Sequence, residues 1–324
     1  MILIFGASRS GTSWLGKIFD SHPNTLYRAE PDKELRNAEI PFLCTDQDIA
    51  TYRDAAAKYA DALMAVHNSN AAGSPPFPRK AYHSDVQYAV RTAMIYGVKS
   101  LGRLPGLGGS FGNMNVPDFA DFRRSGDVRM VMKSVGSLGR LGLFLAAMPD
   151  AKVILIIRHP CGHVASVIAG QKTRNLPQNA ALGGLGETAP ARERGLNQST
   201  LDGLPLVEQL AWRWLILNEL ALRQSDGNDN VMVLKYEDLC AEPEPVARRL
   251  FEFAGLPWSE QTAGFVAEST ASRNETGSGY FSVNRDPLIS AMKWKTQMEP
   301  DDIAAVRRVV DKSRPGSLFA QDYD

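Results

Sequence analysis

A glycine-rich turn near the N-terminus brings together residues that could hold a phosphate or a sulfate group. Residues 6–13 have the spacing G-x-x-x-x-G-T-S, with Arg9 and several hydroxyl side chains inside the turn. The apolar residues 2–5 predict a buried strand before the turn, and the pattern from Thr12 onward predicts a helix after it. Backbone N–H groups in such a turn, with the positive end of the helix dipole, form a cradle for an anion.

This spacing differs at one position from the nucleotide-binding P-loop, whose penultimate residue is a lysine. Thr12 occupies that position here, and the positive charge stands at Arg9 instead. A P-loop nucleotidase also needs an aspartate near a strand end to hold Mg²⁺. None of the predicted strands ends in such an aspartate, so a P-loop kinase or NTPase is the less favoured alternative.

Basic residues follow several other predicted strands. Strands are expected at 26–27, 129–133, 152–157 and 230–236, and the last three of them end in Lys133, Arg158 and Lys235. Strands that alternate with helices predict a parallel sheet, whose ligands bind at the carboxyl ends of the strands. The sequence therefore predicts an α/β fold, a P-loop-like single domain over residues 1–324 with a central parallel sheet flanked by helices.

Further helices and loops should surround this sheet. Helices are expected over residues 46–69, 79–98, 138–148, 206–223, 243–254, 259–268 and 299–312. Two stretches rich in glycine and proline, near 100–118 and 170–204, are expected to be irregular inserted loops that shape a substrate pocket. A third loop is expected over 272–288.

Composition narrows the class of protein. Lys and Arg together number 36, as do Asp and Glu, so the net charge is zero and bulk attraction to nucleic acid is not expected. The three cysteines, Cys44, Cys161 and Cys240, are far apart and have no metal-ligand spacing. No apolar run is long enough to span a membrane, and no leader is apparent. A cytoplasmic location and a reducing compartment are therefore expected.

The loop and a second motif together resemble the sulfotransferase family. Arg9-Ser10-Gly11-Thr12-Ser13-Trp14 is similar to the family's loop for the 5′-phosphosulfate of 3′-phosphoadenosine 5′-phosphosulfate, PAPS. Arg158-His159-Pro160 with Ser166 resembles its second motif, which binds the 3′-phosphate. The resemblance implies that these residues bind the donor, and that Tyr236, in the segment Tyr236-Glu237-Asp238-Leu239, closes the nucleotide pocket.

The resemblance is looser near the C-terminus. Arg285 and Trp294-Lys295 resemble the segment that folds over the nucleotide, but the Arg-Lys-Gly triplet of cytosolic members is missing. Arg285 is therefore only a candidate ligand of the 3′-phosphate. His159 and His163 have no role in the motifs and are expected to be structural or surface residues.

The same resemblance bears on the catalytic base. Cytosolic members place a histidine two residues after the lysine that corresponds to Lys133, and Val135 occupies that position here. His22-Pro23, Tyr27 and Glu30-Pro31 are instead similar to the pattern of the carbohydrate 6-O-sulfotransferase branch. The resemblance implies that Glu30 is the base, with the backbone before Pro31 expected to be extended. His22 and His83 are the next candidates.

The resemblance implies an enzyme that moves a sulfuryl group from PAPS to an acceptor hydroxyl and releases 3′,5′-ADP, without a metal. Glu30, Arg9 and Lys133 would be catalytic, with Arg9 also binding the donor. The acceptor could be a carbohydrate, a lipid headgroup or a small-molecule alcohol. A non-catalytic nucleotide-binding protein is the second alternative, and assembly into a homo-oligomer is left open.

Overall fold

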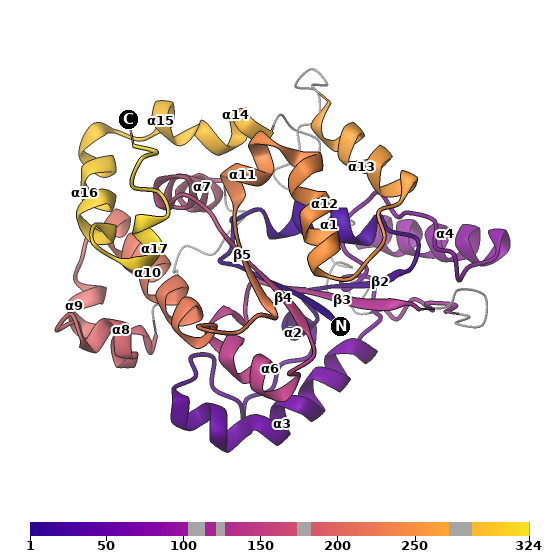
Figure 1. The fold of residues 1–324 in the computed structure, drawn as a ribbon, viewed down its shortest axis with the longest axis horizontal. Coiled ribbons are helices and arrows are strands. Elements are labelled where there is room, and N and C mark those ends of the chain that lie inside the picture. Colours follow the sequence, from indigo (N-terminus) through magenta and orange to yellow (C-terminus); the bar gives the residue numbers. More distant parts are fainter. Residues whose placement is uncertain (103–113, 121–126, 174–182, 272–286, 324) are drawn as a thin grey trace.

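The centre of the protein is a five-stranded parallel sheet. The computed structural model describes residues 1–102, 114–120, 127–173, 183–271 and 287–323. The strands are β1 (Ile2–Phe5), β2 (Thr25–Ala29), β3 (Arg129–Ser134), β4 (Lys152–Ile157) and β5 (Val231–Lys235), in the order β2-β3-β1-β4-β5. Every neighbouring pair is parallel, so the predicted fold class is confirmed (Figure 1).

Helices cover both faces of this sheet because β1 is apolar at every position. Ile2 and Ile4 point into one core, with α1 (Thr12–Asp20), α12 (Pro243–Phe253) and α13 (Glu260–Thr270). Leu3 and Phe5 point into the other, with α3 (Asp46–Ala65), α6 (Leu141–Ala147), α7 (Pro160–Lys172), α10 (Leu206–Gln224) and α16 (Pro300–Val310). Successive side chains of a strand face opposite sides, so a strand buried on both faces has no polar alternation.

The remaining elements complete the described part of the chain. They are α2 (Pro31–Glu34), α4 (Asp85–Leu101), η1 (Leu138–Arg140), η2 (Leu185–Glu187), α8 (Ala189–Arg192), α9 (Gln198–Asp202), α11 (Tyr236–Ala241), α14 (Pro287–Met292), α15 (Trp294–Gln297) and α17 (Arg314–Ser317).

The boundaries of two predicted helices were wrong. The helix expected over 46–69 ends at Ala65, because Val66 is extended, and the helix expected over 79–98 begins only at Asp85. Ser84 and Gln87 form a capping box there, in which each side chain accepts the backbone N–H of the other residue. Residues 66–84 consequently form a connecting segment that packs beside the sheet edge and α1.

The stretch 170–204 is less irregular than predicted. It begins within α7, and its described C-terminal half contains η2, α8 and α9, each only three to five residues long. Residues 174–182 lie outside the described part, as do 103–113 in the expected loop near 100–118 and 272–286 in the third loop.

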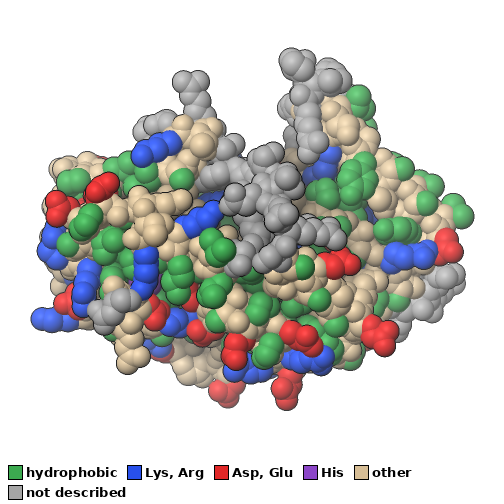
Figure 2. All heavy atoms as spheres, turned by 90° about the horizontal axis from the view of Figure 1, so that it is seen from above, with side chains coloured by type: hydrophobic (Ala, Val, Ile, Leu, Met, Phe, Trp, Pro, Cys, Tyr) green, Lys and Arg blue, Asp and Glu red, His purple; other side chains and the backbone are tan. Residues whose placement is uncertain are grey.

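The surface shows no large region of one charge on the face drawn in Figure 2, where basic and acidic side chains are interspersed. This pattern agrees with the zero net charge of the chain. Among the helices that the structure describes, none combines the length and the apolar character needed to cross a membrane.

Candidate active site

A cavity of about 840 Å³ lies at the carboxyl ends of the strands. Residues from both predicted motifs line it, together with side chains from α2, α4, α14 and the segment 66–84. A parallel sheet brings the carboxyl ends of its strands to one edge, which is why motifs far apart in sequence meet here.

The glycine-rich turn presents the N-terminus of α1 to this cavity. Gly11 precedes the helix with a φ of 85°, and no side chain caps the first turn. A Cβ atom at Gly11 would lie 2.2 Å from Cδ2 of Tyr236, so both the backbone angle and the close approach require glycine. The uncapped N–H groups of α1 are free to bind an anionic ligand.

The two motifs contact each other directly. Arg9 Nε donates a hydrogen bond to Ser166 Oγ at 3.0 Å, and Arg158 donates through Nη1 to the carbonyl of Arg9 at 3.0 Å. All three residues line the cavity. The residues that the resemblance assigns to the 5′ and 3′ ends of the donor thus form one cluster.

Arg158 is held on several sides. Its Nη2 donates to the carbonyl of Ser290 at 2.9 Å, and its guanidinium lies 5.1 Å from the centre of the Tyr236 ring. Its Nε is buried and has no partner among the described residues. A Cβ atom at Gly162 would lie 3.0 Å from this Nε, so the glycine leaves room for the guanidinium.

Most of the remaining predicted donor ligands reach the cavity. Thr12, Ser13, Trp14 and Tyr236 line the cavity. Ser10 does not line it, and its Oγ is buried without a described partner. Arg285 lies outside the described residues.

Glu30 and Lys133 form an ion pair across the ends of β2 and β3. Lys133 Nζ donates to Glu30 Oε1, and both residues line the cavity. The lysine side chain is 4% exposed and the glutamate side chain 29%, so the carboxylate is the part that reaches the open space.

The prediction of an extended backbone at Glu30 was wrong. Its backbone is left-handed, with φ 48° and ψ 49°. Its N–H donates to the carbonyl of Lys133 at 2.7 Å, and its carbonyl accepts from Lys33 at 3.0 Å. These bonds outweigh the preference that Pro31 imposes. Arg9 has a φ of 70°, so two of the four described non-glycine residues with positive φ are predicted catalytic residues. Such backbone strain is concentrated at functional sites.

The histidines lie apart from the cavity lining. His22 Nδ1 accepts from the N–H of Asn24 at 3.1 Å, and His83 contacts the carbonyl of Asp118 at 2.5 Å. Burial lowers the pKa of both. His159 and His163 are buried, and desolvation lowers the pKa of each to about 3.

Glu237 connects two helix N-termini next to the cavity. Its Oε1 accepts the backbone N–H of His159 at 3.0 Å, which connects the start of α11 to the start of α7. Arg158 lies just before α7 and Tyr236 is the first residue of α11. Burial raises the pKa of Glu237 to about 7.

Sequence reasoning missed part of the cavity wall. Lys17, Asn70, Ser74, Lys99, Ser290 and Lys293 also line it. Lys17 could have been found, because it follows the loop on the same helix. The residues of the segment 66–84 carry no motif, and only the folded chain brings them here. Within the described ranges, no three His, Cys, Asp or Glu side chains are grouped as metal ligands would be.

Comparison with known proteins gives similarity over most of the chain, beyond the short motifs. The family model described as "Sulfotransferase family" matches residues 2–260. Carbohydrate sulfotransferase 1 of Danio rerio is 21% identical over 93% of this chain and 73% of its own length. Carbohydrate sulfotransferase 1 of Mus musculus is 22% identical over 94% and 75%. Carbohydrate sulfotransferase 3 of Homo sapiens is 31% identical, over 25% of this chain and 17% of its own.

Two solved structures are also similar. The sulfotransferase domain from the curacin biosynthetic pathway covers 96% of both chains with 17% identity and a TM-score of 0.46. Mouse sulfotransferase SULT7A1, complexed with PAP, covers 100% of this chain and 88% of its own, with 13% identity and a TM-score of 0.47. The family model spans most of the length of this chain. The chain therefore belongs to the sulfotransferase family, and the predicted enzyme class, a PAPS-dependent sulfotransferase, is confirmed.

Proposed function

We propose that this enzyme transfers the sulfuryl group of PAPS to a hydroxyl of a carbohydrate acceptor, with Glu30 as the base. One observation carries the proposal: the Glu30 carboxylate and the cluster of Arg9, Arg158 and Ser166 line the same cavity. The names of the relatives that cover most of the chain favour a carbohydrate over a lipid or another alcohol.

The donor would be held by groups that prefer anions. The N-terminus of α1, with Thr12 and Ser13, suits the 5′-phosphosulfate, and Arg158 with Ser166 suits the 3′-phosphate. The Nε of Arg158 is buried without a partner among the described residues, which fits this assignment, because a buried donor without an acceptor is costly until a ligand supplies one. Arg9 lies between the two ends and would stabilise negative charge on the leaving phosphate.

The chemical step would need only one proton transfer in the protein. Glu30 takes the proton of the acceptor hydroxyl while the oxygen of that hydroxyl forms a bond to sulfur. The bond between sulfur and the 5′-phosphate oxygen breaks, and its electron pair leaves on 3′,5′-ADP. Lys133 orients the Glu30 carboxylate through their ion pair. Positioning and electrostatic stabilisation would supply most of the rate enhancement.

A transfer assay with PAPS and a panel of carbohydrate, lipid and simple alcohols tests the proposal. Formation of 3′,5′-ADP together with a sulfated sugar is the expected result. Sulfation of only the non-carbohydrate alcohols would contradict the acceptor assignment. Retention of the rate in a chelator is expected as well, and a loss that added Mg²⁺ restores would contradict the metal-free step.

The cytoplasmic location stays a prediction, supported by the state of the cysteines. Cys44, Cys161 and Cys240 are free and buried, as in proteins of reducing compartments. Fractionation of cells that express the protein would test it. Sedimentation would decide whether a homo-oligomer forms.

A further inference from the structure

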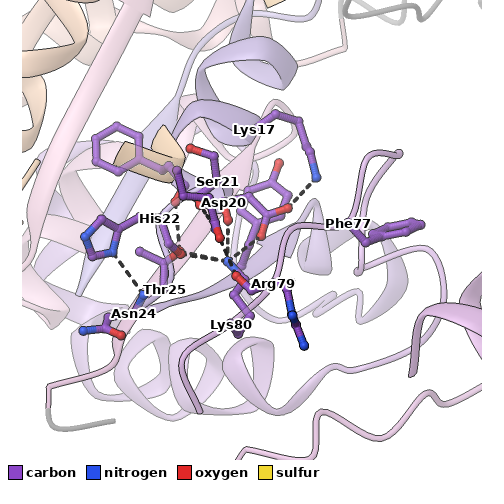
Figure 3. A network of polar contacts seen from close by, with 12 residues as sticks. Lys17, Asp20, Ser21, His22, Asn24, Thr25, Phe77, Arg79 and Lys80 are labelled. Atoms are coloured by element: carbon purple, nitrogen blue, oxygen red, sulfur yellow. Dashed lines mark hydrogen bonds and ion pairs between the residues drawn. The ribbon is translucent and has the colours of Figure 1, made fainter. Parts of the chain in front are cut away.

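Three buried charged residues form a cluster beside the cavity that the donor motifs do not explain. Asp20, at the end of α1, pairs with Lys17 from the same helix and with Lys80 from the segment 66–84 (Figure 3). The distance from Lys80 Nζ to Asp20 Oδ1 is 3.0 Å. The exposed fractions of the three side chains are 4% for Lys17, 7% for Asp20 and 7% for Lys80. One carboxylate therefore balances two ammonium groups away from solvent.

The two lysines differ in what they can still bind. Lys80 also contacts the carbonyls of Asp20 and His22 and the hydroxyl of Thr25, so its donors are satisfied within the protein. Burial lowers its pKa to about 8, although Asp20 opposes this shift. Lys80 therefore fastens the segment 66–84 to the end of α1, and it does not line the large cavity.

Lys17 does line the cavity. Apart from Asp20, its ammonium donates to the carbonyl of Pro76 at 2.5 Å. An ammonium group has three N–H donors. Two of these donors have hydrogen-bond partners among the described residues, and the ammonium group also lies 5.5 Å from the centre of the Phe77 ring. One N–H therefore remains for a ligand in the cavity that Lys17 lines.

A second group of buried charges lies next to Asp20 and Lys80 and does not line the large cavity. Arg28 and Arg91 share Asp118, at 2.5 Å and 3.5 Å, and these side chains are at most 18% exposed. The whole chain has as many acidic as basic residues, so this excess of buried positive charge is local. A buried charge without a counterion is unfavourable, and an anionic ligand beside Lys17, which alone of these basic residues lines the large cavity, would relieve part of this excess.

The position of Lys17 assigns it to the acceptor and not to the donor. It lies one and a half turns after the N-terminus of α1 and contacts the segment 66–84, whose Asn70 and Ser74 also line the cavity. Tyr27, on β2, lines the same cavity as Lys17 and Glu30. Burial raises the pKa of Tyr27, and the carboxylates of Asp20 and Glu30 both raise it further.

We propose that Lys17 determines specificity for an acceptor that carries a fixed negative charge, a carboxylate, sulfate or phosphate, near the hydroxyl to be sulfated. This inference rests on the proposed function, because it assigns a substrate class to the same site. Lys33 and Lys99, which line the cavity as well, would add to the attraction at its rim.

Matched pairs of acceptors test the inference. 4-Nitrophenyl β-D-glucuronide and 4-nitrophenyl β-D-glucoside differ at C6, where a carboxylate replaces the hydroxymethyl group, so the pair tests the ring hydroxyls that both share. In sn-glycerol 3-phosphate and glycerol, a phosphorylated headgroup and its neutral form, one hydroxyl of glycerol is replaced by a phosphate. Within at least one pair, the charged acceptor should be preferred in kcat/KM by roughly tenfold or more, the value of one charge-assisted hydrogen bond. The pair that shows the preference identifies the source of the charge.

Lys17→Met should abolish this preference, mainly by raising KM for the charged acceptor. The variant should fold, because Asp20 keeps its partner Lys80. Lys58→Met, which changes an exposed lysine of α3 outside the cavity lining, is the charge-matched control and should keep the preference. Affinity for 3′,5′-ADP should be unchanged in both variants.

Calorimetry separates this inference from the proposed function. Binding of the same four acceptors is measured in the presence of 3′,5′-ADP, where no transfer takes place. Tighter binding of a charged probe to the wild type than to Lys17→Met supports the inference even if no acceptor is sulfated, which would count against the proposed function alone. Equal binding of charged and neutral probes to the wild type, or equal binding to both proteins, would overturn it.

Discussion

The two sides of the cavity are built in different ways. The proposed donor side consists of residues at or just after strand ends, Arg9 after β1 and Arg158 after β4, and these bind one another directly. The acceptor side joins the ends of α1, β2 and β3 to the segment 66–84, through pairs such as Lys17 with Asp20 and Lys80 with Asp20.

This difference explains why short motifs indicate the donor side, whereas most of the acceptor side, apart from Glu30 and Lys133, carries no motif. Every parallel sheet of this kind gathers its carboxyl ends, so a donor site needs only short local motifs. The acceptor side depends on how a loop of no regular structure packs against a helix. Substitutions on the two sides should therefore have separable effects, on nucleotide affinity on one side and on acceptor use on the other.

The largest effect should come from Glu30 on the acceptor side. Glu30→Gln keeps the shape of the side chain but cannot accept a proton, so the turnover rate should fall by roughly 10²–10⁴-fold. Affinity for 3′,5′-ADP should stay that of the parent, because the donor ligands lie in other segments. Single-turnover kinetics and calorimetry measure the two quantities.

Glu34→Gln is the matched control for Glu30. Glu34 lies on the same turn and lines the same cavity, where its Oε2 accepts from Asn68 and Asn70 at 2.9 Å and 3.1 Å. Its variant should keep most of the rate. A Glu30→Gln enzyme of nearly normal rate would reduce Glu30 to a loop carboxylate.

On the donor side, Arg158→Ala should remove the preference for 3′,5′-ADP over 5′-AMP. A charged hydrogen bond lost in a buried site typically costs about 1.5–3 kcal/mol, which corresponds to roughly tenfold to a hundredfold in affinity. Titration of both nucleotides by calorimetry measures it. Arg248→Ala, at an exposed arginine of α12, is the control and should leave the preference intact. Equal affinities of the wild type for the two nucleotides would contradict the 3′-phosphate assignment.

Gly11→Ala should disturb the donor side through the backbone. The new Cβ would meet the Tyr236 ring, and φ is 85°, so the free energy of unfolding should fall by about 1–3 kcal/mol. Gly264→Ala in α13 meets nothing within 4 Å and should instead stabilise the protein by roughly 0.5–1 kcal/mol. Chemical denaturation compares the two. Equal stability of both variants would show that the loop tolerates a side chain at Gly11.

The smallest expected effect is a pH dependence of stability at Glu237. Burial raises its pKa from 4.5 to about 7 in the folded protein, so the folded state holds a proton that the unfolded chain releases. The stabilising contribution is complete below pH 4.5 and is lost as the pH rises to about 7, at no more than about 1.4 kcal/mol per pH unit.

Glu237→Gln should remove this slope. The buried His159 and His163, with pKa values of about 3, change stability in the opposite direction as the pH rises through the acid range. Only the difference between the wild type and Glu237→Gln, measured by denaturation at several pH values, therefore isolates the carboxylate. A constant difference across pH 4.5–7 would contradict the raised pKa.

By itself, the sequence determined the fold class, the five strands and the donor motifs. Apolar strands buried on both faces and a glycine turn before a helix are local patterns, and local patterns have few alternative structures. Glu30 was singled out by the resemblance to the carbohydrate sulfotransferase pattern and not by local patterns, and β2 ends at the same edge of the sheet as β1 although β3 lies between them.

Only the tertiary structure decided the left-handed turn at Glu30, the pairing of Arg9 with Ser166 and the charge cluster around Asp20. The first depends on hydrogen bonds to β3, which outweigh the local preference before proline. The charge cluster around Asp20 brings together Lys17 and Lys80, which are 63 positions apart in the chain, through a segment with no motif and no helix or strand. Burial makes an unpaired charge energetically unfavourable. Burial is a property of the packed chain and not of any short stretch of sequence.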